Sequence, residues 1–370
     1  MTNAILQKLN TKKDQSNHPA ILEMREFNKA HPHSKEIYKQ AIAKYLDLAK
    51  RQKTSDGVFL GCSDVGALNP FLVAWYSATA LKTPFIEPQA KYHELSDYQK
   101  RILKETWGMH LFCTWRLTQS IYKMGREFLM LASNKPIPDE TPLSFFATLP
   151  EWSQYIELEN SNVILYSDPN SEENRARLIG FWATYDLKHL NGKYKRILLL
   201  TPHMDGMTDT AQDLFQPYQI PLDPENTLGK LTSATHADPE YRANRNIIRY
   251  LLSCLLWLCT DKPDINKDGE FVAKNELKAP KYGVKKSGEF LAPNAPTVYT
   301  VGQRAEKDEQ EKQAQLKRAK DEQEKDGNRS HVRPHIRKAH WHGFWKGKVS
   351  EPENRKWVMH WIPSIFVNGK

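Results

Sequence analysis

Cysteine is scarce in this chain, and long apolar runs are missing. The 370 residues include only four cysteines, Cys62, Cys113, Cys254 and Cys259, which are too few for a disulfide framework. The longest apolar run, residues 251–259, is far shorter than the ~20 residues of a membrane-spanning helix. The first residues contain no apolar signal segment with a cleavage site. These features exclude a disulfide-rich secreted scaffold and a helical membrane protein, and they predict a cytoplasmic protein with no membrane partner.

Positive charge is concentrated near the C-terminus. Residues 329–370 contain 9 Lys+Arg against 2 Asp+Glu, whereas the preceding 328 residues contain 44 against 42. The same 42 residues hold 5 of the 13 histidines and 4 of the 10 tryptophans. Clustered positive charge interleaved with aromatic side chains is typical of nucleic-acid binding. The composition therefore predicts an RNA-facing module at this end of the chain.

Periodicity and composition divide the chain into five segments. We expect a flexible leader (1–33), a helical region (34–135) ending in a long helix from about residue 97 to 132, an α+β core (136–302), a charged linker or insertion (303–328), and a basic His/Arg/Trp-rich module (329–370). Within the core, residues 162–168, 177–187 and 195–204 are typical of strands, and residues 241–259 of a buried helix.

Helical and strand patterns are segregated along the chain, not alternating. This order favours the α+β class over a doubly wound sheet. We expect a helical N-terminal part and a mixed or antiparallel sheet that includes the C-terminal strands.

The candidate nucleic-acid or phosphate site lies in the basic module. Because side chains alternate along a strand, a strand over residues 339–345 would place His340, His342 and Phe344 on one face and Trp341 and Trp345 on the other. Arginine and histidine side chains bind phosphates, and exposed aromatic rings stack on bases. The residues assigned to this site are His331, Arg333, His335, Arg337, Lys338, His340, Trp341, His342 and Trp345.

The same cluster is compatible with two other chemistries. A metal-independent ribonuclease could use His340 or His342 as acid or base, with a nearby cation stabilising the phosphate. The histidines could also bind zinc, but no Cys or carboxylate stands at ligand spacing and the arginines repel a cation. We therefore assign no catalytic residue, metal or cofactor, and we keep the ribonuclease and a generic RNA-binding module as alternatives.

Three weaker motifs do not support a site. Residues 264–269 resemble the start of a calcium loop, but Asn275 stands where a bidentate Glu is needed. His203 and Asp205 follow an apolar strand without a nucleophile nearby. Cys62 lies in a glycine-bearing loop that lacks the register of a nucleophile elbow.

The string SHVRPHIRKAHWHGFWKG at residues 330–347, followed by WIPSIFVN at 361–368, resembles a C-terminal signature of phage and plasmid proteins. These include a type V-A anti-CRISPR family that blocks biogenesis of the CRISPR effector nuclease. The resemblance implies recognition of the effector's nascent N-terminal peptide and loss of its mRNA. The implied partners are that peptide and the ribosome or mRNA, with the N-terminal part facing the peptide or ribosome and the basic module facing RNA.

Overall fold

The computed structural model describes residues 17–32, most of 107–133, 136–166, 175–205, 217–233, 244–277, 295–326 and 333–367, with short gaps. Its centre is a mixed sheet of nine described strands, in the order β6-β5-β4-β2-β1-β9-β7-β8, with β3 paired to β4. The strands are β1 (Ser120–Met124), β2 (Ser153–Leu158), β3 (Ile164–Tyr166), β4 (Arg175–Leu190), β5 (Lys193–Asp205), β6 (Tyr218–Pro221), β7 (Ile265–Lys267), β8 (Glu270–Phe271) and β9 (Thr297–Val301). β1 is parallel to both β2 and β9, and the other described pairs are antiparallel.

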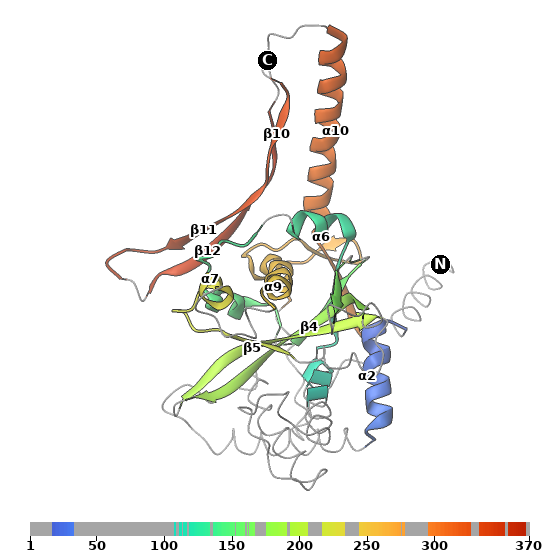
Figure 1. Ribbon diagram of the computed structural model, residues 1–370, viewed down its shortest axis with the longest axis vertical. Helices are drawn as coiled ribbons and strands as arrows, with labels where there is room; N and C mark the ends of the chain where they lie inside the picture. Colours follow the sequence, from blue (N-terminus) through green and yellow to red (C-terminus); the bar gives the residue numbers. More distant parts are fainter. Residues whose placement is uncertain are drawn as a thin grey trace.

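The two faces of the sheet bury separate cores. The larger core contains α9 (Arg245–Cys259), α6 (Arg126–Ser133), the short helix α7 (Leu228–Thr232) and a 3-10 turn, η3 (Leu143–Thr148). α9 is apolar on nearly every side and lies at the centre of this core (Figure 1). On the opposite face, α2 (Pro19–Ala30) packs with Trp115, Tyr155 and Trp182. Helices combined with a large mixed sheet, most of whose described strand pairs are antiparallel, confirm the α+β class.

Three expectations about the elements were wrong. Residues 1–33 were expected to be a flexible leader, but Pro19–Ala30 form α2, with Ala20 and Ile21 buried against the sheet. The long helix expected to reach residue 132 is interrupted by β1, after Gln119 adopts a positive φ of 47°. The C-terminal strands do not join the large sheet, and they pair with one another in two small sheets.

The charged segment is a helix, α10 (Gln303–Asp326), that extends away from the body of the protein (Figure 1). Its base is anchored by side-chain caps. The Asp264 carboxylate accepts hydrogen bonds from the backbone N–H groups of Arg304, at 2.7 Å, and Ala305, at 3.2 Å. These caps satisfy amides that have no partner within the helix. No helix among the described residues is long and apolar enough to cross a membrane.

Candidate nucleic-acid interface

The C-terminal strands form one bent antiparallel ribbon on the outside of the molecule (Figure 1). β10 (His335–Arg337) pairs with β13 (Ile365–Val367), and β11 (His340–Lys346) pairs with β12 (Lys356–Ile362). Branched and aromatic residues dominate these strands, which suits a half-buried pleated surface. The β11–β12 part lies beside α9, and the β10–β13 part runs along α10.

The inner face of β11–β12 is a row of tryptophans that packs on the core. Trp341 is only 6% exposed, and its ring lies 4.9 Å from that of Trp257 on α9 and 5.1 Å from that of Trp361 on β12. Trp345 lies farther along the same face, 5.4 Å from Trp357, and is 41% exposed. Large aromatic side chains bury much apolar area, so this face attaches the ribbon to the body.

The outer face of β11–β12 is cationic and aromatic. By register, His342 lies directly opposite His360, Phe344 opposite Val358, and Lys346 opposite Lys356. The Phe344 ring lies 5.5 Å from that of His342 and 5.4 Å from that of His360. All three of these rings are exposed. The expected alternation over residues 339–345, with histidines and Phe344 on one face and tryptophans on the other, is therefore confirmed.

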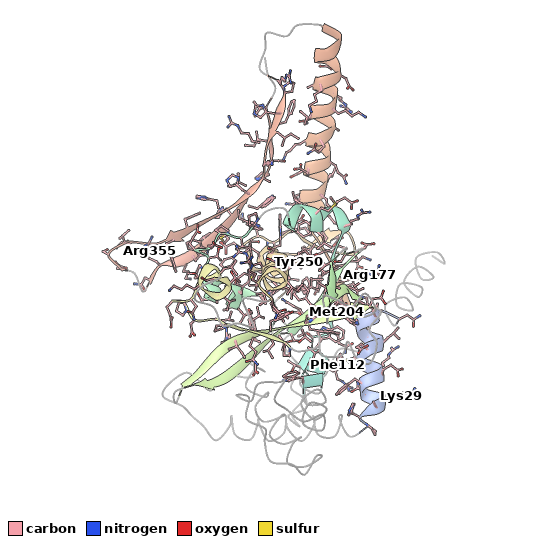
Figure 2. All side chains as sticks on the ribbon, in the orientation of Figure 1. Lys29, Phe112, Arg177, Met204, Tyr250 and Arg355 are labelled. Carbon is pink, nitrogen blue, oxygen red and sulfur yellow. The ribbon has the colours of Figure 1, made fainter. Side chains whose placement is uncertain are left out.

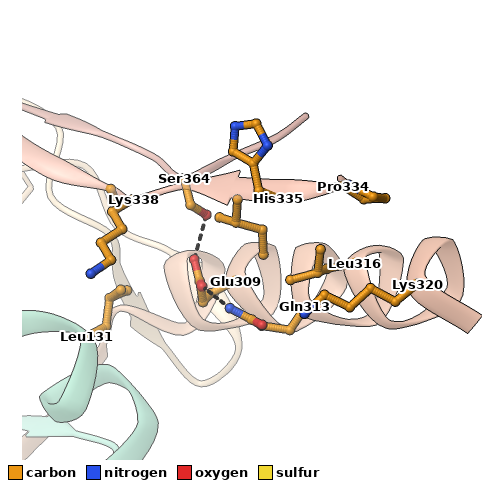
Figure 3. A pocket seen from close by; sticks show the side chains of 11 residues that line it. Leu131, Glu309, Gln313, Leu316, Lys320, Pro334, His335, Lys338 and Ser364 are labelled. Carbon is orange, nitrogen blue, oxygen red and sulfur yellow. Dashed lines mark hydrogen bonds between the residues drawn. The ribbon is translucent and has the colours of Figure 1, made fainter. Parts of the chain in front are cut away.

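The β10–β13 part, which runs along α10, is also basic. Arg333, His335, Arg337 and Lys338 are all exposed. In Figure 3 the His335 ring points away from α10, whereas Ser364 points toward it. The Ser364 hydroxyl donates a hydrogen bond of 2.5 Å to the Glu309 carboxylate. This contact attaches the ribbon to α10.

A cleft of about 270 Å³ separates α10 from the ribbon (Figure 3). Its apolar lining includes Leu131, Leu316 and Ile336, and Lys320 and Lys338 lie at its margin. The cleft is small and open on one side, and it lies along the contact between α10 and the ribbon.

The structure places most of the expected site residues at exposed positions of the ribbon. His340 and His342 share the outer face of β11, and Arg333, His335, Arg337 and Lys338 are exposed on or beside β10. Trp341 is a correction: it lies on the inner face of the strand against Trp257, so it cannot stack on a base. Trp345 is half-exposed near the turn, and His331 lies outside the described residues.

The contribution of β12 to the outer face was not predicted from the sequence. His360 and Lys356 complete the outer face because they lie opposite His342 and Lys346. The available signal was the matching pair of His-Trp dipeptides at 340–341 and 360–361. Only the pairing register places the two histidines of the facing strands together.

Arg355 lies at the turn end of the ribbon, far from Tyr250 and Met204 in the body (Figure 2). Its guanidinium donates a hydrogen bond of 3.3 Å to the Trp345 carbonyl and lies 6.0 Å from the centre of the Trp345 ring. Lys348 pairs with Glu351 at 3.2 Å in the same turn. Glu351 is the only carboxylate among the described residues of this turn, and it is paired with Lys348.

The weaker motifs have structural roles. Residues 264–271 form the β7–β8 hairpin, in which Asp268 and Gly269 make the turn and Asp264 caps α10. His203 is buried and hydrogen-bonded to Tyr155 at 2.9 Å, and burial lowers the pKa of its imidazole to about 4. Asp205 pairs with Arg177 at 2.6 Å. Cys62 lies outside the described residues, and no group of three metal-ligating side chains occurs within them.

Comparison with known proteins points to one family. A search of curated proteins found no match. Among solved structures, the crystal structure of AcrVA2 is similar to this chain, with 28% sequence identity and a TM-score of 0.66, covering 95% of this chain and 99% of that one. The family model described as AcrVA2-like, anti-CRISPR type V subtype A2, matches residues 122–369. That range includes the end of β1, every later strand of the large sheet, α10 and the whole ribbon, and this chain therefore belongs to the AcrVA2-like family of type V-A anti-CRISPR proteins.

Proposed function

We propose that this anti-CRISPR protein blocks biogenesis of the type V-A effector nuclease. It recognises the effector's N-terminal peptide during translation in the bacterial cytoplasm and promotes loss of the effector mRNA. The observation that supports an RNA-facing role is the position of the ribbon. Its cations are exposed on the outside of the molecule, and no Asp or Glu occurs in its four strands. An RNA backbone is the polyanion that such a surface meets during translation.

The first test measures effector transcript in cells with and without this protein, beside an unrelated transcript. We expect only the effector transcript to fall. Two recoded effector genes then distinguish recognition of the peptide from recognition of the RNA sequence. Synonymous recoding of the first codons keeps the peptide and should preserve the effect, whereas a compensated frameshift over the same codons changes the peptide with little change of RNA and should abolish it. Sensitivity to the synonymous change alone would contradict peptide recognition.

The ribbon's part is tested in the same cells. Neutralising Arg333, Arg337 and Lys338 to Gln removes three exposed cations and should restore the transcript. The matched control neutralises Lys307, Lys317 and Arg318, three exposed cations of α10. An equal effect of the two triple variants would show that the ribbon has no special role.

One observation favours a second function, a general ribonuclease. His342 and His360 form a direct cross-strand pair, so their rings are close enough for one to act as base and the other as acid on a single phosphodiester. This function predicts that purified protein degrades naked RNA in EDTA and that His342→Ala and His360→Ala each abolish the activity. It also predicts that both transcripts fall in the cell test.

A further inference from the structure

The outer face of β11–β12 carries a cluster of three exposed rings, those of His342, Phe344 and His360. Phe344 is 37% exposed and lies beside the cross-strand pair His342 and His360, with its ring inclined at 36° and 38° to theirs. β11 contacts the core through its other face. The exposed Phe344 ring is therefore not needed for packing. Rings in this arrangement offer flat surfaces on which a base can stack.

Cations lie at both ends of the ring cluster, those of Lys346 and Lys356 on the same face as the rings. Lys346 and Lys356 form the cross-strand pair two residues beyond Phe344, and Arg337 and Lys338 lie just before β11. All four side chains are exposed. Aromatic rings between two groups of cations match a nucleic-acid strand whose bases lie on the rings while its phosphates contact the cations at either side.

From this arrangement we infer that the outer face of β11–β12 binds unpaired RNA in an extended form, with one base stacked on Phe344. The inference deepens the RNA-facing role proposed above and rests on it. The seven residues of β11 extend over about 20 Å, room for roughly four nucleotides. Lys346 and Lys356 hold phosphates on one side of the stacked base, and Arg337 and Lys338 hold them on the other.

Paired RNA does not fit this surface. In an A-form duplex the base faces are hidden by stacking, and the deep, narrow major groove excludes side chains. The exposed rings of the ribbon can therefore stack only on a base that is not already stacked within a duplex. The outward residues of β11 and β12 include no Asn, Gln, Asp or Glu, the side chains that most often read adenine or cytosine edges. Binding should accordingly depend weakly on base sequence.

The test uses the purified full-length chain and fluorescence anisotropy with three labelled probes: a 12-nucleotide oligo(U), a 12-nucleotide oligo(A) and a blunt RNA hairpin of equal phosphate number. We expect both unpaired probes to bind at least about fivefold more tightly than the hairpin, with affinities within about fivefold of each other. Hairpin binding as tight as that of the unpaired probes would overturn the inference. So would tight binding of polyglutamate, which would indicate an acidic protein partner.

Variants test the stacked base and the phosphates separately. Phe344→Leu should weaken oligo(U) binding about fivefold or more, and Phe344→Trp should retain it. Phe271→Leu, which changes another exposed phenylalanine on β8, is the control and should have no effect. The double change Lys346→Gln and Lys356→Gln should reduce the slope of log affinity against log salt by about 1.4, and Lys307→Gln with Lys317→Gln should not. Unchanged binding by Phe344→Leu, with the melting curve unaltered, would overturn the inference.

This test can fail independently of the proposed function. If naked RNA does not bind but the effector transcript still falls in cells, the RNA surface assigned here is wrong and peptide recognition remains. If unpaired RNA binds as expected but the effector transcript is unchanged, the binding surface is correct and the proposed function is wrong.

Discussion

The Glu306 carboxylate accepts a hydrogen bond of 2.8 Å from the backbone N–H of Phe128. Glu306 lies in the first turn of α10 and Phe128 in the first turn of α6, so a side chain of one helix caps the other. Together with the Asp264 caps, this bond fixes the base of α10 to the core. The direction in which α10 and the adjoining ribbon leave the body therefore depends on a few residues at this junction.

Gly302, at the base of α10, should be intolerant of any side chain. It has a φ of +83°, and a Cβ atom there would overlap the Phe128 ring. Gly302→Ala should lower the free energy of unfolding by roughly 2–5 kcal/mol, from backbone strain and overpacking combined. Urea denaturation measures this loss.

Gly269 is the matched control for that change. It has nearly the same φ, +86°, but nothing lies within 4 Å of a Cβ atom built there. Gly269→Ala should therefore cost only the backbone strain, about 1–2 kcal/mol. Equal losses for the two variants would contradict the close approach of Phe128 to Gly302.

Glu151 should make the protein less stable as pH rises. Its carboxyl is buried, and desolvation raises its pKa to about 8. Between the usual value of 4.5 and about 8, the folded state retains a proton that the unfolded state has lost, so stability falls with rising pH. Glu151→Gln should remove this dependence, leaving the variant more stable than the parent at pH 8 and similar to it at pH 5.

Thermal melts of parent and variant from pH 5 to 8 would measure the effect. The Gln side chain keeps the size of the glutamic acid and can still hydrogen-bond, so packing is little disturbed. A constant offset between the two proteins at every pH would contradict a shifted pKa and indicate a packing effect alone.

The sequence predicted the elements whose pattern is local. α9 lies within the expected residues 241–259, and β4 and β5 cover the expected strands 177–187 and 195–204. β1 was mistaken for helix because a central strand buried on both faces gives an apolar run without strict alternation. Its parallel partners, β2 and β9, begin more than 30 and 170 residues later in the chain. Such pairing cannot be read from a short window of sequence.

The alternation of side chains along β11 could be predicted from the sequence, but the pairing of β11 with β12 and its packing on α9 could not. Strand periodicity alone separates His342 from Trp341. Whether Trp341 meets a base or the core depends on α9, whose Trp257 comes from a distant part of the chain. The cross-strand position of His360 depends on the length of the turn between β11 and β12. Tertiary contacts thus decided which of the expected residues are available to a ligand.

His203 should make the protein lose stability in acid. Its pKa is lowered to about 4, first by burial and then by the nearby His18. Between the usual value of 6.5 and about 4, the unfolded state binds a proton that the folded state does not, so stability falls as pH decreases through this window. The groups that face the imidazole are the Tyr155 hydroxyl, the Trp182 ring, His18 and Asp205.

His203→Gln should flatten this part of the profile. The variant should be less stable than the parent at pH 7, because Tyr155 and Trp182 lose a well-packed neighbour, but the difference should shrink toward pH 4.5. Urea denaturation at pH 7.0, 5.5 and 4.5 measures the difference. A gap that stays constant would show that His203 does not account for acid sensitivity.

Trp341 and Trp345 lie on the same face of β11 and should differ sharply in their contribution to stability. Trp341 packs on Trp257 and is 6% exposed, whereas Trp345 is 41% exposed beyond the end of that contact. Trp341→Ala should lower the free energy of unfolding by about 3–5 kcal/mol, the usual cost of removing a buried tryptophan. Trp345→Ala should cost about 1 kcal/mol. Urea denaturation with amide hydrogen exchange in α9 would measure both, and exchange in α9 should increase only for Trp341→Ala, because of these two residues only Trp341 contacts Trp257 of that helix. Equal effects of the two changes would mean that the ribbon is not attached to the body through Trp341.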